Sequence, residues 1–390
     1  MTRLLAGAIV LALGVIPATA QSLDDLNIQI HGYATQGFLY TNQNNAFTTK
    51  SSDGSPAWSE VVVNVTAQPI PKLRVGVQAR YFLLGNFGNE ITLDWADADY
   101  KVNDKFGVRV GKVKIPSNLF NETQDIDPSY VWALLPQSVY TLPDRDSQLS
   151  LYGGVAYGTL KLGNNLGKLE YRGWGGYQVI PSSDGYWIAL REAGMNLPNG
   201  LSGINTGAAL HWRTPLTGLM IGGSDIRRPA WSSPLTFAPA PGVMLTGSMD
   251  VKAFNEWAVF GIYEKDKLMI AGEYNRLAPG ITMSFPNMPI PFPIDKRQWY
   301  GMASYKVTGK FTAGIYDSQQ INRALPLSTG PARFSKDWVV SGRYDFNQFL
   351  YAKAEEHFID GTDNYFDTNL NPNGVKPTTN LTILKMGVSF

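Results

Sequence analysis

The feature that most constrains the fold of this chain is the alternation in length of its connecting segments. Seven short, polar turns alternate with eight longer segments that are polar or rich in proline and glycine. This alternation predicts up-and-down hairpins, with tight turns at one rim and long loops at the other. Seven turns and eight loops join sixteen strands, which places the start of the first strand and the end of the last strand at the rim of tight turns. The turns lie at 69–72, 103–105, 163–168, 215–218, 265–267, 308–310 and 346–348, and the longer segments at 41–57, 85–89, 116–146, 181–202, 228–248, 278–296, 320–336 and 361–377.

Within the expected strands, apolar and polar residues alternate with a period of two. Val61, Val63 and Val65 fall on one face of their segment, while Glu60 and Asn64 fall on the other. A membrane-barrel strand shows this pattern because one face contacts lipid and the other faces water. A soluble β-sandwich also alternates, but it has no reason to sort its connections by length. We therefore expect an all-β fold, a closed antiparallel transmembrane β-barrel of about sixteen strands with a pore-constricting loop. The alternation recurs at 73–81, 299–307 and 338–346.

The N-terminus has the three parts of a secretory signal peptide. Arg3 carries a positive charge, the stretch 4–16 is apolar, and Ala18 and Ala20 form a small-residue cleavage site. The apolar stretch is too short to span a bilayer as a helix, which requires about 20 residues. We expect residues 1–20 to be cleaved and residues 21–390 to form the barrel after export through the periplasm. The chain contains no cysteine, which excludes a lipoprotein anchor, a disulfide and a thiolate metal site.

The charge balance argues against nucleic acid as a partner. Lys and Arg number 33 and Asp and Glu number 32, whereas a protein that binds the phosphate backbone needs a basic surplus. No stretch after residue 20 approaches the length of a transmembrane helix. Composition therefore leaves a large secreted β protein or a membrane barrel, and the connection lengths favour the barrel. We expect no cofactor.

The C-terminal segment places four apolar residues on one face: Leu384, Met386, Val388 and the terminal Phe390. This segment resembles the C-terminal assembly signal of bacterial outer-membrane barrels. Over essentially its whole length, the mature chain is similar to the sixteen-stranded porins of Gram-negative bacteria. The resemblance implies a water-filled channel in the cell outer membrane that passes small hydrophilic solutes by diffusion. It also implies a homotrimer surrounded by outer-membrane lipids, with one loop folded into each lumen.

A narrower resemblance rests on two short segments, 97–101 and 108–116. They are similar to porins of the phosphate-selective type and their relatives that take anions or dicarboxylates. The motif is short, so a general diffusion channel, a sugar channel and an organic-anion channel all stay open at this point. Aromatic residues do not discriminate between them, because tyrosine and tryptophan are also needed in the lipid girdles.

The segment 116–146 is the longest of the eight longer segments and the third in order. In the porins that the chain resembles, the third long loop bends inward and sets the constriction. A solvent-exposed loop would not need the apolar residues of this segment. We therefore expect these residues to pack inside the barrel and the carboxylates of the segment to face water. The alternative is an extracellular loop that contacts a neighbouring subunit. The apolar residues are Leu119, Phe120, Trp132, Leu134 and Leu135, and the carboxylates are Glu122, Asp125, Asp127, Asp144 and Asp146.

Positive charge is expected on the barrel wall that faces this loop. Alternation places Arg80 and Arg109 on the polar face of their strands, with Asp97 and Asp99 on the strand between them. A cationic wall facing an anionic loop produces a transverse field across a narrow pore. Because Asp97 and Asp99 share the wall, we expect only a weak anion preference, strongest at low salt. Ordinary solvated barrel charge is the alternative.

Lys112 and Lys114 break the alternation of their strand, because they continue the outward phase of Val110. A lipid-facing lysine costs about 2–4 kcal/mol near the membrane midplane and about 0–1 near the interface. We predict a bulge around Gly111 that turns both lysines into the lumen, since bulges re-aim side chains in this way. A location of both lysines near the rim is the alternative.

Two other classes of function carry weaker signals. A barrel enzyme needs a nucleophile beside a base, and His31, His211 and His357 lie outside any serine-containing signature. We therefore expect no enzymatic activity. The segment 360–367 carries oxygen ligands without the EF-hand order, so we expect a solvated loop rather than a calcium site. An adhesin is disfavoured, because most of the longer segments are short for that role.

Overall fold

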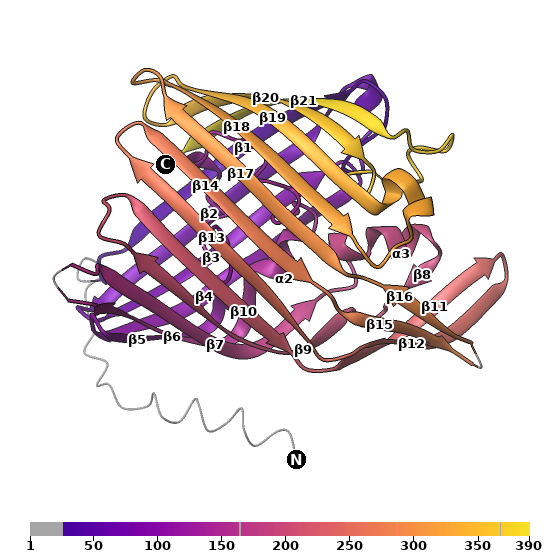
Figure 1. Cartoon of the computed structure of the whole chain (residues 1–390), viewed down its shortest axis with the longest axis horizontal. Coiled ribbons are helices and arrows are strands. Elements are labelled where there is room, and N and C mark those ends of the chain that lie inside the picture. The colour runs from indigo at the N-terminus through magenta and orange to yellow at the C-terminus, as the bar shows by residue number, and fades with distance from the viewer. Residues whose placement is uncertain (1–25, 164, 287, 367) are drawn as a thin grey trace, which may run out of the picture.

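The computed structural model describes residues 26–390 except 164, 287 and 367. In this part of the chain, sixteen strands form one closed antiparallel barrel, and five further strands form a second sheet (Figure 1). The expected fold class and strand number are confirmed. The predicted signal peptide, residues 1–20, lies outside the described residues. The barrel strands are β1 (Gln29–Thr41), β2 (Ser55–Ile70), β3 (Leu73–Leu84), β4 (Phe87–Asn103), β5 (Phe106–Lys114), β6 (Ser150–Lys161), β7 (Lys168–Ile180), β9 (Leu201–Arg213), β10 (Leu219–Arg228), β13 (Phe254–Lys265), β14 (Leu268–Leu277), β17 (Lys296–Lys306), β18 (Phe311–Asn322), β19 (Phe334–Asp345), β20 (Leu350–Gly361) and β21 (Thr378–Ser389).

The barrel closes by pairing its first strand with its last. The ladder between β1 and β21 runs from Tyr33 opposite Ser389 to Thr41 opposite Leu381. The backbones of Gly32 and Phe390 also exchange two hydrogen bonds of 3.0 Å. Because β1 starts and β21 ends at the rim of short turns, both ends of the barrel lie at that rim, as expected.

One longer segment differs from the prediction. Residues 85–89 were expected to form a loop, but β4 begins at Phe87 and leaves only Gly85 and Asn86 as the turn. Gly85 has a φ of 59°, a left-handed conformation that glycine adopts without a steric cost. Two residues therefore suffice at this point of the long-loop rim.

Two further segments, 228–248 and 278–296, form hairpins rather than irregular loops. Together with a short strand they make a five-stranded sheet that projects beyond the barrel (Figure 1). Leu235, Met249 and Met283 are buried in this sheet together with Trp187 of the segment 181–200. Burial of this second core explains why these segments are regular strands. They are β8 (Met195–Asn196), β11 (Trp231–Ala240), β12 (Val243–Val251), β15 (Gly280–Phe285) and β16 (Met288–Pro293).

The two faces of the barrel wall have opposite chemistry. Val61, Val63 and Val65 are exposed on the outer face, whereas Glu60 and Gln78 are buried on the inner face. This is the arrangement that the alternation predicts. Among the described residues, no helix is both long enough and apolar enough to cross a membrane.

Candidate channel constriction

The segment 115–149, which joins β5 to β6, folds into the barrel and crosses its interior. Trp132 packs in one apolar cluster with Tyr316 of β18. The backbone N–H of Ser138 donates a 3.1 Å hydrogen bond to Ser318 Oγ of the same strand. In the sixteen-stranded ring, β18 lies eight strands from β5, so these contacts reach the opposite wall. Leu134 packs in a second cluster with Trp58 of β2.

Asp127 anchors this segment to the wall formed by β20 and β21. Its carboxylate lies 3.0 Å from Lys353 Nζ and 2.5 Å from Lys385 Nζ. The hydroxyl of Tyr351 donates a 2.7 Å hydrogen bond to it. Burial by itself raises the pKa of Asp127, but the two ammonium groups outweigh burial and hold the pKa well below its ordinary value. The carboxylate is therefore charged and paired.

Asp125 makes the corresponding anchor on β3 and β5. Its carboxylate lies 2.6 Å from Lys114 Nζ, and Gln78 Nε2 donates a 2.7 Å hydrogen bond to it. Lys114 Nζ also donates a 2.9 Å hydrogen bond to the carbonyl oxygen of Glu122. The ammonium group of Lys114 thus lies inside the barrel, in contact with the loop.

Arg80 sits in a buried network rather than on an open pore wall. Its side chain is 1% exposed, and its guanidinium lies 2.6 Å from Glu60 and 2.8 Å from Asp146. Asp146 belongs to the short helix α2 (Arg145–Leu149). Arg145 of this helix in turn pairs with Asp94 of β4 at 2.8 Å. These pairs bind the end of the loop to β2, β3 and β4.

A third group of charges, built around Glu122, stays partly open to water. The Glu122 carboxylate lies 3.2 Å from both Arg109 and Arg172. The three side chains are 29%, 20% and 21% exposed, in that order. Asp97 and Asp99 of β4 approach Arg109 at 3.9 and 3.5 Å, and Glu170 of β7 approaches Arg172 at 3.4 Å. Sequence reasoning missed Arg172, although its alternation with Tyr171 in β7 places it on the inner face.

Lys112 does not turn into the lumen, so the prediction for this residue is wrong. The ladders pair Lys112 with Ala96 and with Tyr152, and Tyr152 is exposed on the outer wall. Pairing continues through Gly111 on both sides without a register shift, so the bulge is not at Gly111. Lys112 keeps its outward phase, and its Nζ donates a hydrogen bond to the carbonyl oxygen of Leu93.

The bulge lies in the neighbouring strand β4 instead. Gln78 pairs with Trp95 and Ala79 pairs with Leu93, which leaves Asp94 as the extra residue. Asp94 and Trp95 are consequently both buried. Lys114 reaches inward because it is the last residue of β5, where the chain leaves the wall and enters the loop.

The far wall contributes a buried cluster that sequence reasoning also missed. Glu355 accepts hydrogen bonds of 2.9 and 3.1 Å from the backbone N–H groups of Ala133 and Leu134. His357 bridges Glu355 and Asp337 at 2.9 and 2.8 Å. Because both ring nitrogens face carboxylates, the imidazole acts as a link between acidic groups rather than as a base beside a nucleophile. The alternation of β20 places Glu355 and His357 on the inner face, and this pattern could have identified them from the sequence.

A loop–loop contact lies beside this constriction. Gly185 of the segment 181–200 approaches Pro143 so closely that an added Cβ would lie 2.3 Å from the Pro143 carbonyl oxygen. Burial, together with the nearby Asp144 carboxylate, raises the pKa of Asp184 to about 8. Burial also raises the pKa of Asp144 to about 7, although the Lys296 ammonium group opposes this shift.

The acidic last loop forms ion pairs with the wall. Asp360 lies 3.5 Å from Lys336, and Asp363 lies 3.3 Å from Lys296. Among the residues that the structure describes, which exclude Asp367, no group of three or more His, Asp or Glu side chains is placed to hold a metal ion.

The architecture can be compared with solved structures. An anion-selective porin from Comamonas acidovorans superposes with a TM-score of 0.56 at 11% identity, over 93% of this chain and 99% of that one. The outer membrane channel DcaP of Acinetobacter baumannii gives a TM-score of 0.54 at 9% identity, over 95% of this chain and 99% of that one. This chain has the fold of the outer-membrane porins.

A third solved structure is described in an oligomeric form. OmpT of Vibrio cholerae, described as a trimer form, superposes with a TM-score of 0.52 at 14% identity, over 93% of this chain and 99% of that one. No protein-family model matches the sequence, and no curated protein matches it. At such low identities the likeness establishes the porin fold alone.

Proposed function

We propose that this chain is an outer-membrane channel through which small hydrophilic solutes and ions diffuse passively. The observation that carries this proposal is the segment 115–149, which crosses the interior of a closed barrel and is held to both walls. A loop held at both walls narrows the lumen. Polar groups at a constriction decide which solutes pass.

The proposed ion preference is weak and for anions. The loop carboxylates Asp125 and Asp127 are neutralised by direct partners. The partly exposed group instead contains two guanidinium groups, from Arg109 and Arg172, which share the Glu122 carboxylate. Asp99 and Glu170 also contact these guanidinium groups but are less exposed, at 14% and 17%. Arginine keeps its charge at all relevant pH values. The two guanidinium groups are more exposed than Asp97, Asp99 and Glu170, so the proposed preference is for anions and is weak. The name of the anion-selective relative is in keeping with this sign.

We also propose that the protein assembles as a homotrimer in outer-membrane lipids. The support is the trimer form described for one structure of the same fold.

Current measured across a planar lipid bilayer tests the channel proposal. The purified protein should produce discrete conductance steps, and a salt gradient should give a small reversal potential with the sign of an anion preference. Absence of steps from correctly folded protein contradicts the channel. A reversal potential with the cation sign leaves the channel standing and contradicts the charge assignment.

A further inference from the structure

Three aromatic side chains form a row on the outer wall across β13, β14 and β17. The ring centroids of Trp257 and Tyr274 lie 5.5 Å apart, and those of Tyr274 and Trp299 lie 6.5 Å apart. All three residues lie near the ends of their strands at the long-loop rim. Tyrosine and tryptophan are enriched where a barrel meets the headgroups of the membrane lipids. The row is therefore placed to contact the headgroup region on this side of the barrel.

Two arginines follow this row toward the long-loop rim. The ladders pair Arg276 of β14 with Trp257 on one side and with Arg297 of β17 on the other. Both guanidinium groups share the carboxylate of Asp295, which lies 3.0 Å from Arg276 and 3.4 Å from Arg297. The two arginine side chains are 39% and 28% exposed, in that order. One carboxylate for two guanidinium groups leaves a surplus positive charge on the outer face.

This pair of arginines keeps hydrogen-bond donors available for an anion. Arg276 uses Nε and Nη2 for Asp295, so its Nη1 donates to no acceptor of the described chain. Arg297 uses Nε for Asp295 and Nη1 for the hydroxyl of Tyr274, which leaves its Nη2. The outward carboxylate of Asp317 on β18 forms no ion pair with either arginine in the described chain. Neighbouring guanidinium groups bind phosphate through several charge-assisted hydrogen bonds, so the pair is suited to a phosphate group.

A third cation lies farther from the membrane on the same face. Gly280 of β15 follows Arg276 by four residues, and alternation keeps the two on one face, while Met283 lies on the other face and is buried. A Cβ added to Gly280 would lie 3.4 Å from Lys252 Cδ, so the Lys252 side chain lies along this face. Lys252 is exposed, and no carboxylate of the described residues forms an ion pair with it.

Beyond these cations, the projecting sheet turns a hydroxyl-rich face in the same direction (Figure 1). Ser284 keeps the even spacing from Arg276 and therefore lies on the same face. Asp250 of β12 accepts hydrogen bonds of 2.6, 2.7 and 3.4 Å from the hydroxyls of Ser232, Ser248 and Ser284. Hydroxyl and carboxylate groups can bond to sugar hydroxyls, whereas the charge of Asp250 repels a phosphate. A phosphate therefore fits at the level of the arginines, and a sugar fits beyond it.

Two other outward cations near the same rim are matched by acidic groups. Arg227 of β10 donates a 2.6 Å hydrogen bond to Asn255 Oδ1, and Asn255 Nδ2 donates one of 2.6 Å to Asp225. Lys336 of β19 lies 3.5 Å from Asp360. These two cations lack the shared geometry of the arginine pair, and they therefore provide a comparison for it.

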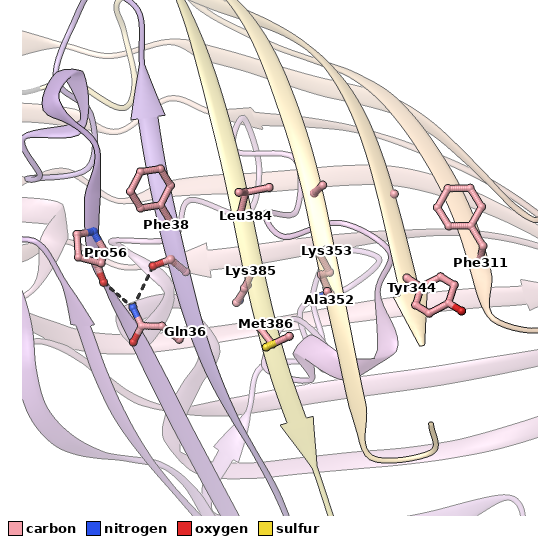
Figure 2. Close-up of a pocket in the computed structure, with 13 residues that line it drawn as sticks. Gln36, Phe38, Pro56, Phe311, Tyr344, Ala352, Lys353, Leu384, Lys385 and Met386 are labelled. Atoms are coloured by element: carbon pink, nitrogen blue, oxygen red, sulfur yellow. Dashed lines mark hydrogen bonds between the residues drawn. The ribbon is translucent and has the colours of Figure 1, made fainter. Parts of the chain in front are cut away.

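The outer wall between β19 and β1 has a different character. It forms an apolar groove of about 670 Å³, lined by Ala352 and bordered by Leu384 (Figure 2). Lys353 and Lys385 also border this groove, but their ammonium groups point into the barrel and pair with Asp127. This part of the wall therefore offers no positive charge to a phosphate.

We propose that the outer wall around Arg276 and Arg297 binds a glycolipid of the outer leaflet whose sugar headgroup carries phosphate. The phosphate is held by the two arginines, and Lys252 adds a positive charge nearby. The acyl chains lie along the wall on the membrane side of the aromatic row, and the sugars reach the hydroxyl-rich face around Asp250. Basic groups beside a membrane bind anionic lipid headgroups in this way. The inference requires a barrel in the outer membrane, but it does not rest on conduction.

Native mass spectrometry of the protein released from detergent micelles counts bound lipid molecules and tests this site. The protein is refolded with diphosphorylated lipid A, with dephosphorylated lipid A or with phosphatidylglycerol. We expect the wild type to retain the diphosphorylated form severalfold better than the other two lipids. Arg276→Gln combined with Arg297→Gln should reduce this preference severalfold. Arg227→Gln combined with Lys336→Gln, which also removes two outward cations, is the matched control and should keep the preference.

Several outcomes would overturn the proposal. Equal retention of the two forms of lipid A by the wild type, or an equal loss of preference in the control variant, overturns the phosphate site at the arginine pair. Equal retention of phosphatidylglycerol overturns the glycolipid as the ligand. Inorganic phosphate in excess should not displace bound lipid A, and complete displacement would show a site for free phosphate instead. A heat-dependent shift in gel migration verifies that each variant is folded, and conductance steps in the same samples test the channel independently.

Discussion

At the level of single residues, the charged side chains inside the barrel fall into two groups: those that hold the loop in place and those that are exposed to water. Asp127 and Arg80 are buried and paired, and removal of one partner of such a pair typically costs about 3–5 kcal/mol. These residues therefore act mainly on stability. Arg109, Arg172 and Glu122 retain 20–29% exposure, so they can interact with a passing ion without a rearrangement of the loop.

Replacing Arg109 and Arg172 together by glutamine should move the reversal potential toward cations. The change removes two positive charges and leaves Glu122 without its partners. The shift should be larger at low salt, because screening acts over about 8 Å at physiological ionic strength. Lys267→Gln, an exposed residue in a short turn, is the matched control and should leave the potential unchanged. An equal potential in the double variant and the wild type contradicts the assignment of this group to the pore.

At the level of elements, the contact between the segments 115–149 and 181–200 contains two carboxyls whose pKa values are raised. Asp184 is buried, and the backbone N–H of Tyr186 donates a 2.8 Å hydrogen bond to it. Its pKa of about 8 and that of Asp144 of about 7 exceed the ordinary value of an aspartate. Folding therefore favours the protonated carboxyls at this contact.

This contact should loosen as the pH rises. A carboxyl with a raised pKa in the folded state contributes stability below its ordinary pKa of about 4 and loses it as the pH rises through 7 to 8. Hydrogen exchange of the backbone at 141–149 and 181–187 should be slower at pH 5 than at pH 8.5 after correction for the intrinsic rate. Asp184→Asn should reduce this difference. Equal corrected rates in the wild type at both pH values contradict the prediction.

At the level of the whole molecule, the barrel and its inner loop form a single packed unit. Apolar clusters and ion pairs connect the loop with strands on both sides of the ring. The solved relatives share 9–14% identity over nearly the whole chain. The same ring thus forms from different side chains, because closure depends on backbone pairing and alternation rather than on particular residues.

Removal of residues 130–140 should increase single-channel conductance, because this part of the loop crosses the lumen. The remaining Asp125 and Asp127 keep their wall partners, so the barrel should still fold. Removal of residues 237–244 from the hairpin of β11 and β12, outside the barrel, is the matched control and should change conductance much less. Unchanged conductance in a folded variant without 130–140 places the loop outside the path of the solute.

The barrel follows from local patterns in the amino-acid sequence. Alternation with a period of two assigned Val61 and Glu60 to opposite faces, and the sorting of connections by length predicted sixteen strands. These are local properties, since each depends on neighbouring residues or on the length of one connection. The same phase placed Arg80, Arg109, Asp97 and Asp99 on the inner face.

The pairing of charges, in contrast, depends on how distant segments come together in the folded chain. Asp127 pairs with Lys385, 258 residues away in the chain, and no local pattern encodes such a contact. Lys112 remained outside because the bulge occurred in β4 and not at Gly111, and the register of β4 depends on its pairing with both neighbouring strands. The hairpins of β11–β12 and β15–β16 required a shared core, which becomes visible only when distant segments are brought together. Alternation therefore predicts the face on which a residue lies, whereas closure of the ring determines the partner that it finds there.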